Sequence, residues 1–140
     1  MTKRAGFTIA ELVVVTAIFF LVIAALTPFI RMARVRSDRI RCANNLREIS
    51  LGLHSYAADH EDAFPESLGE LYRGYIANDG AFDCPASKAI GTHKSPDYSY
   101  AAKLRETSEP KEAIAADLDG NHKKAGKNIL RIDGSVEWVR

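Results

Sequence analysis

Residues 7–30 read FTIAELVVVTAIFFLVIAALTPFI, and this apolar stretch decides how the rest of the chain is organised. As an α-helix it extends for about 36 Å, which exceeds the roughly 30 Å hydrocarbon thickness of a bilayer. Its only ionisable side chain is Glu11, and its only helix breaker is Pro28. A secretory signal peptide has a shorter, charge-free apolar core that ends at a small-residue cleavage site. The stretch therefore predicts a transmembrane helix.

Charged residues are distributed unevenly along the chain. The 140 residues carry 19 Lys and Arg against 18 Asp and Glu, which gives a formal net charge of +1. This balance argues against a basic nucleic-acid-binding protein. Residues 31–60 carry a net charge of +3, whereas residues 61–140 carry −3. The sequence thus predicts one membrane segment attached to one small water-soluble region.

The N-terminal sequence MTKRAGFTIAELVVV carries a motif with fixed spacing. A short basic leader ends at Gly6, Phe7 follows, and Glu11 is the fifth residue counted from Phe7. This pattern resembles the N-terminal cleavage and methylation motif of type IV prepilins and type II secretion pseudopilins. The resemblance implies that a prepilin peptidase removes the leader, residues 1–6, by cutting between Gly6 and Phe7. It also implies that the new amine of Phe7 is methylated.

Glu11 is an ionisable side chain in an otherwise apolar segment. A charge at the centre of a bilayer costs at least about 2.5 kcal/mol, so such a residue needs a partner. Cleavage creates an ammonium at Phe7, one helical turn away, and opposite charges attract strongly in a low dielectric. We expect Glu11 to pair with the Phe7 amine of a neighbouring subunit and to set the register of a filament. The alternative is that Glu11 only extends to the lipid headgroups.

Two charge signals disagree about the orientation of the membrane segment. Five Arg follow it, whereas only Lys3 and Arg4 precede it, and the positive-inside rule then places the downstream side in the cytoplasm. The prepilin motif implies the opposite orientation, with the leader in the cytoplasm. We follow the motif and expect a single-pass protein of the bacterial inner membrane with its C-terminal region in the periplasm.

Beyond residue 30 the apolar pattern becomes amphipathic. Apolar residues recur at spacings of three and four, namely at Ile40, Ala43, Leu46, Ile49 and Leu53. We predict one helix over residues 7–58, with a transmembrane half at 7–30 and an amphipathic stalk at 31–58. Pro28 is expected to kink this helix or to melt a turn, because proline removes a backbone donor and clashes with the preceding turn.

Residues 59–140, called the head below, hold most of the turn signals. We predict a short helix over residues 67–76 and short strands at 98–101 and 113–116. Two alternating runs joined by Asp133-Gly134 predict a β-hairpin over residues 128–139 with a two-residue type I′ turn. The predicted fold class is α+β, with a long N-terminal helix packed on a small antiparallel sheet, and it resembles that of type IV pilins.

A second resemblance extends over the stalk and the head. A C-x-N-N-L run begins at Cys42, an H-x-Y pair begins at His54, and a C-terminal histidine precedes the Asp-Gly turn. These features are similar to those of a pseudopilin subgroup with a C-terminal H…DG hairpin. In this chain ten residues separate His122 from Asp133, whereas nine is usual in that subgroup, so the role of His122 stays open.

The chain has two cysteines, Cys42 and Cys84. An even number of cysteines in an exported region suggests a disulfide, which stabilises the fold by about 3–4 kcal/mol on the chain-entropy argument. The alternative is a pair of buried free thiols. No C-x-x-C motif occurs together with histidines at ligand spacing, so the sequence predicts no zinc site.

Asp117, Asp119 and Asn121 place oxygen-bearing side chains at alternate positions around a turn. Calcium prefers such ligands, and the major pseudopilins that this chain resembles have a calcium-binding loop near the C-terminus. The run lacks the remaining ligands of an EF-hand loop. The alternative is a solvated turn whose side chains accept backbone hydrogen bonds. No other cofactor is predicted.

The sequence contains no nucleophile motif and no phosphate-binding loop, so we predict a structural protein and not an enzyme. The resemblance implies a pseudopilin that assembles with other pseudopilins into a type II secretion filament, driven by a partner secretion ATPase and a platform protein. One alternative is a major or minor pilin for adhesion, motility or DNA uptake. Another is a membrane-anchored periplasmic enzyme or binding module.

Overall fold

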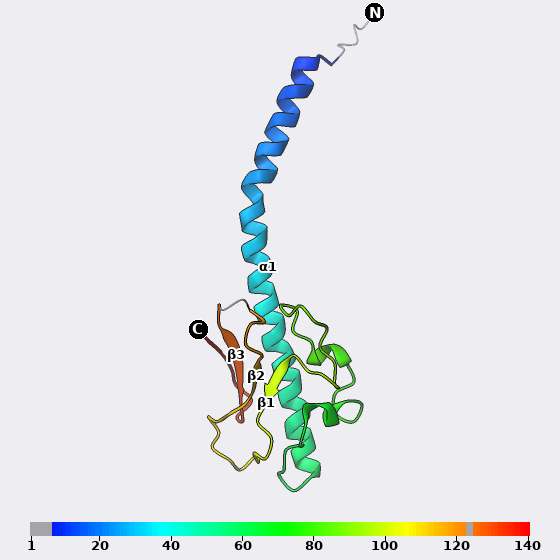
Figure 1. The fold of residues 1–140 in the computed structure, drawn as a ribbon, viewed down its shortest axis with the longest axis vertical. Coiled ribbons are helices and arrows are strands. Elements are labelled where there is room, and N and C mark those ends of the chain that lie inside the picture. The colour runs from blue at the N-terminus through cyan, green and yellow to red at the C-terminus, as the bar shows by residue number, and fades with distance from the viewer. Residues whose placement is uncertain (1–6, 123–124) are drawn as a thin grey trace, which may run out of the picture. The chain divides into compact units, whose positions relative to one another are not determined.

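The computed structural model describes residues 7–122 and 125–140. Within them the chain forms one long α-helix, two short 3₁₀ helices and four β-strands (Figure 1). In chain order these are α1 (Ile9–Asp59), η1 (Leu68–Leu71), η2 (Asp79–Phe82), β1 (Tyr98–Tyr100), β2 (Ala113–Asp117), β3 (Lys127–Arg131) and β4 (Val136–Val139). The chain divides into two compact units, the first ending at Arg34 and the second covering Val35–Arg140.

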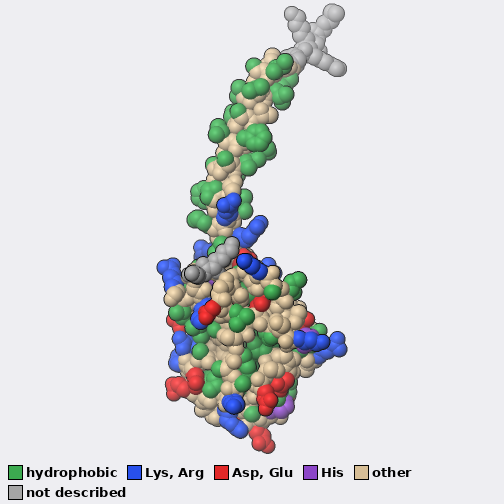
Figure 2. All heavy atoms as spheres, viewed as in Figure 1, with side chains coloured by type: hydrophobic (Ala, Val, Ile, Leu, Met, Phe, Trp, Pro, Cys, Tyr) green, Lys and Arg blue, Asp and Glu red, His purple; other side chains and the backbone are tan. Residues whose placement is uncertain are grey.

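The first unit contains the apolar part of α1. This part is long and apolar enough to cross a membrane, and none of its apolar window is buried against the rest of the protein. Figure 2 shows hydrophobic side chains along its visible face, and Leu21 is 70% exposed. The helix continues through Pro28 without a break, so no turn is melted there. Such a surface is stable only in lipid or against other apolar chains.

The second unit is built around the remainder of α1. One face of the helix is buried, and it comprises Cys42, Leu46, Ile49, Leu53 and Ala57. The prediction for Leu46, Ile49 and Leu53 is confirmed, but the prediction that Ile40 lies on this face is wrong, because Ile40 is 50% exposed. Two residues advance about 200° around a helix, so burial of Cys42 turns Ile40 towards the opposite side.

The four strands form one antiparallel sheet in the order β1-β2-β3-β4. Ile114 and Leu130 from the sheet, and Ile132 just after β3, join the same core as the buried face of α1. Along β3 the side chains alternate, with Asn128 and Leu130 buried and their neighbours partly exposed. The predicted α+β class, a long N-terminal helix packed on a small antiparallel sheet, is confirmed.

The turn of the C-terminal hairpin differs from the predicted type. The Gly134 amide donates to the Arg131 carbonyl at 3.0 Å, and the Arg131 amide donates to the Ser135 carbonyl at 2.9 Å. These bonds enclose a three-residue loop in which Gly134 has a φ of +78°. A type I′ turn requires positive φ at both central residues, and Asp133 does not have it. The hairpin therefore exists, but the two-residue turn was a wrong prediction.

Lys111 holds the Asp133 carboxylate beside this turn. The Lys111 Nζ atom lies 2.6 Å from Asp133 Oδ2, and the Ser135 amide donates to Asp133 Oδ1 at 3.0 Å. The hydrogen bond from Lys111, followed by those from Ser135, lowers the pKa of Asp133 well below its usual range. Asp133 is therefore ionised in this turn, and its carboxylate fixes the position of Ser135 by a hydrogen bond.

The predicted helix over residues 67–76 is also wrong in its extent. Only a single 3₁₀ turn forms, at Leu68–Leu71, and it begins with a capping box in which Glu70 accepts from the Ser67 amide at 2.9 Å. Arg73 then takes a left-handed φ of 68°, and the Ile76 amide donates back to the Leu71 carbonyl at 2.8 Å. The chain therefore forms this turn instead of a second helical turn, and the Ile76 side chain packs against α1.

Gly52 is the position on α1 that receives Ile76. A Cβ atom at Gly52 would lie 2.8 Å from Ile76 Cγ1, which is closer than van der Waals contact allows. We expect Gly52→Leu to destabilise the protein by about 1–3 kcal/mol, because overpacking forces side chains and backbone to shift. Denaturant unfolding of the detergent-solubilised protein measures this loss. Gly74→Leu is the control, since nothing lies within 4 Å of a Cβ there, and equal losses in both variants would contradict the packing role.

Candidate functional site

The N-terminal motif falls only partly within the described residues. Gly6 and the rest of the leader, residues 1–6, lie outside them, whereas Phe7 is described and is 74% exposed. Glu11 lies in the first turn of α1, where its Oε2 atom accepts hydrogen bonds from both the amide and the hydroxyl of Thr8, each at 2.8 Å. The Thr8 hydroxyl accepts in return from the Glu11 amide at 3.3 Å.

Thr8 and Glu11 thus form a capping box at the start of α1. In this arrangement a Thr at the N-cap and a Glu three residues later satisfy each other's free amide groups. The signal is readable in the sequence as T-x-x-E before an apolar run, and our sequence reasoning missed it. In a single chain the Glu11 carboxylate therefore already has local partners and caps the helix, and its pairing between subunits stays a prediction.

Cys42 and Cys84 are joined by a disulfide in the structure, with their Cα atoms 5.3 Å apart. Both residues are buried, with exposures of 0% and 1%. The bond connects α1 to the loop that follows η2, and the Cys84 amide donates to Asp97 Oδ2 at 3.2 Å in the same loop. The disulfide therefore attaches the first part of the head directly to the helix.

His122 and Asp117 lie beside this disulfide. The His122 Nε2 atom is 3.6 Å from Cys84 Sγ and 3.1 Å from Asp117 Oδ2, and both side chains are almost fully buried. Asp117 Oδ2 also accepts from the amide and the side chain of Asn128, at 2.7 and 2.8 Å. The histidine that sequence reasoning left without a role, and Asn128, which it did not single out, thus belong to one buried polar cluster.

Of the three predicted calcium ligands, the two carboxylates, Asp117 and Asp119, lie in different surroundings. Asp117 is buried in the cluster described above, whereas the Asp119 side chain is 90% exposed and lies 3.0 Å from Lys127 Nζ. The Asn121 side chain donates to the Asp97 carbonyl at 3.0 Å. Within the described residues, the only group of His, Cys, Asp and Glu side chains close enough to hold one ion includes Asp117 but not Asp119.

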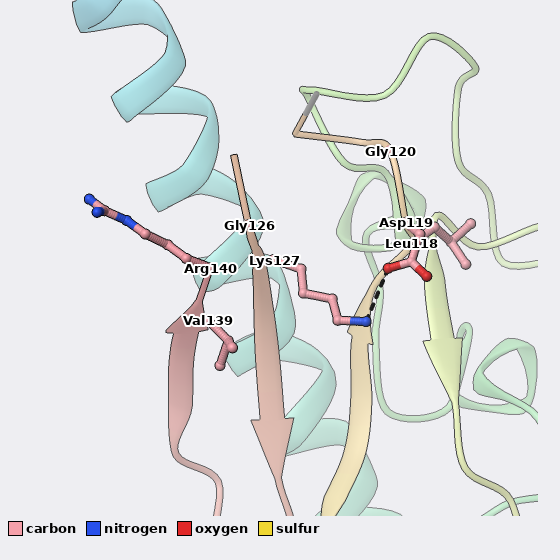
Figure 3. Close-up of a pocket in the computed structure, with 7 residues that line it drawn as sticks. All are labelled: Leu118, Asp119, Gly120, Gly126, Lys127, Val139 and Arg140. Carbon is pink, nitrogen blue, oxygen red and sulfur yellow. Dashed lines mark hydrogen bonds and ion pairs between the residues drawn. The ribbon is translucent and has the colours of Figure 1, made fainter. Parts of the chain in front are cut away.

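A cavity of about 330 Å³ lies at the edge of the sheet where β2 and β4 end and β3 begins (Figure 3). Its lining includes Leu118, Val139 and the ion pair between Asp119 and Lys127. Figure 3 shows the Lys127 side chain extending to the Asp119 carboxylate. Among the described residues that line this cavity, the Asp119 carboxylate is therefore the acidic side chain, and it is paired with Lys127.

A second cavity of about 330 Å³ separates α1 from β4 and is basic on its helical side. Arg39 places its guanidinium carbon 4.2 Å from the centre of the Trp138 ring, and the His122 ring packs on the same indole in a T-shaped arrangement with ring centres 5.2 Å apart. Cation–π contact of this kind contributes about 0.5–1 kcal/mol at exposed sites. Trp138 thus covers the buried cluster on one side and supports Arg39 on the other.

Comparison of the chain with protein-family models, with curated proteins and with solved structures finds no match. What is established is therefore an α+β fold with one N-terminal helix that is apolar enough to cross a membrane.

Proposed function

We propose that this protein is a pilin-like structural subunit, and specifically a pseudopilin of a type II secretion filament. The observation that carries the proposal is that the two parts of α1, a 51-residue helix, have different surfaces. Its N-terminal part is apolar, exposed and acidic only at Glu11, while its C-terminal part forms the core of a small antiparallel head. A helix of this kind can be held first by lipid and then by neighbouring helices in a filament.

The proposed location is the bacterial inner membrane, with one transmembrane pass and the head in the periplasm. The disulfide between Cys42 and Cys84 supports this orientation, because disulfides persist in the periplasm and are rare in the cytosol. The proposed partners are a prepilin peptidase, other pseudopilins, a secretion ATPase and a platform protein. Lipid and then neighbouring subunits cover the exposed apolar surface.

Leader cleavage is the direct test of this proposal. Co-expression with a prepilin peptidase is expected to shorten the chain by the six residues that precede Phe7. The reason is that the junction lies between a basic leader and an apolar helix and requires a small residue at position 6. Intact-mass measurement with N-terminal sequencing detects the cut and the methylated Phe7 amine.

Two variants at the junction make this test specific. Gly6→Ala keeps a small residue and is expected to be processed, whereas Gly6→Phe is expected to stay full length. A leader that remains intact in the native sequence, or a cut at another peptide bond, would refute the pilin-like assignment.

A further inference from the structure

Four side chains of metal-binding type meet inside the head from four separate segments. Cys42 comes from α1, Cys84 from the loop after η2, Asp117 from the end of β2, and His122 from the connection between β2 and β3. Their ligand atoms all lie within 4.8 Å of one another, and all four residues are buried. Thiolate, imidazole and carboxylate are the ligands that proteins use for zinc.

The distances within this group suit a tetrahedral ion. A tetrahedral zinc with bonds of about 2.3 Å to sulfur and about 2.0–2.1 Å to nitrogen or oxygen separates its ligand atoms by roughly 3.3–3.8 Å. The His122 Nε2 atom is 3.6 Å from Cys84 Sγ and 3.1 Å from Asp117 Oδ2. His122 Nε2 therefore already lies close to the required spacing from one sulfur and from one Asp117 oxygen, and the remaining ligand atoms lie within 4.8 Å.

Asp117 provides the independent sign that a ligand belongs here. Among the described residues its Oδ1 atom has no hydrogen-bond partner, and its side chain has an exposure of 0%. A buried carboxylate oxygen without a partner is costly and rare in folded proteins. The other oxygen, Oδ2, accepts two hydrogen bonds from Asn128, at 2.7 and 2.8 Å. Such bonds hold a carboxylate in place for a metal, since outer partners orient metal ligands.

We propose that the reduced head binds one Zn²⁺ through Cys42, Cys84, Asp117 and His122. Four protein ligands leave no open position, so the ion has a structural role. The chain is synthesised with free thiols, and binding displaces their protons, so this form needs no reductant. The metal and the disulfide exclude each other, because each uses both sulfur atoms. Zinc thus connects α1 to the head before the disulfide does.

The test uses the full chain in detergent, prepared once with its thiols reduced by a phosphine and once with the disulfide intact. Titration with Zn²⁺ against a chromophoric chelator, together with elemental analysis, gives affinity and stoichiometry. We expect one zinc per reduced chain and none per oxidised chain. X-ray absorption of the reduced, zinc-loaded protein is expected to show two sulfur ligands at about 2.3 Å and two nitrogen or oxygen ligands at about 2.0–2.1 Å.

Matched variants separate this site from the exposed turn nearby. Asp117→Asn and His122→Gln are expected to weaken zinc binding at least tenfold. Asp119→Asn and His60→Gln make the same changes at exposed positions outside the cluster and are expected to leave the affinity unchanged.

Three results would overturn the proposal: no zinc bound by the reduced protein, equal affinities for Asp117→Asn and Asp119→Asn, or a metal shell with fewer than two sulfurs. If Asp117→Asn fails to fold, the number of sulfur ligands that X-ray absorption finds in the native protein tests the proposal without that variant. None of these measurements depends on leader cleavage or on filament assembly.

Discussion

Glu11→Leu is expected to abolish filament assembly while membrane insertion and leader cleavage persist. The change removes the only charge from the apolar segment, which eases insertion by roughly 2–4 kcal/mol. In the proposed filament, where Glu11 pairs with the Phe7 ammonium of a neighbouring subunit, the change leaves that ammonium without its carboxylate in an apolar contact, a loss on the order of 3 kcal/mol or more per interface. Cross-linking of subunits, run beside a leader-cleavage assay, measures both effects.

The capping box between Thr8 and Glu11 supplies the controls for this experiment. Glu11→Gln keeps a side chain that can accept from the Thr8 amide but removes the charge, so it is expected to fail in assembly like Glu11→Leu. Thr8→Ala keeps the charge and removes the cap at a cost of about 0.5–2 kcal/mol, so it is expected to assemble. Normal assembly by Glu11→Gln, with failure by Thr8→Ala, would show that the residue acts only as a helix cap.

Removing both cysteines is expected to cause the largest loss of folding stability. The disulfide closes a separation of 42 residues, and the chain-entropy argument assigns it about 3–4 kcal/mol. We expect Cys42→Ala combined with Cys84→Ala to lose about this amount in denaturant unfolding. Alanine is preferred to serine here because both positions are buried, and a serine hydroxyl would need a partner.

Two comparisons make the cysteine experiment decisive. In the presence of a chelator, the reduced native protein is expected to show the same loss as the double variant, because neither bond nor metal then connects α1 to the head. Thiol alkylation without reductant is expected to find no free thiol in exported protein. A double variant as stable as the oxidised native protein would show that packing alone holds the Cys84 loop on the helix.

Local properties of the sequence were sufficient for three main features of the fold. The apolar run at residues 7–30, the spacing of Leu46, Ile49 and Leu53, and the hairpin around Asp133-Gly134 each depend on near neighbours in the chain. The helix predicted over residues 67–76 failed where another segment of the chain intervenes. There the helix stops early, because Arg73 adopts a left-handed conformation and the chain turns so that Ile76 packs against Gly52.

The buried cluster, in contrast, was decided by tertiary structure. Asp117 and Asp119 are two residues apart and looked equivalent in sequence, yet one side chain has an exposure of 0% and the other 90%. The difference arises because β2 ends at Asp117 on the inner face of the sheet, while Asp119 lies in the turn beyond it. Cys42 and Cys84 reach the same place only because the sheet and the loop pack on one face of α1, and sequence spacing does not encode that contact.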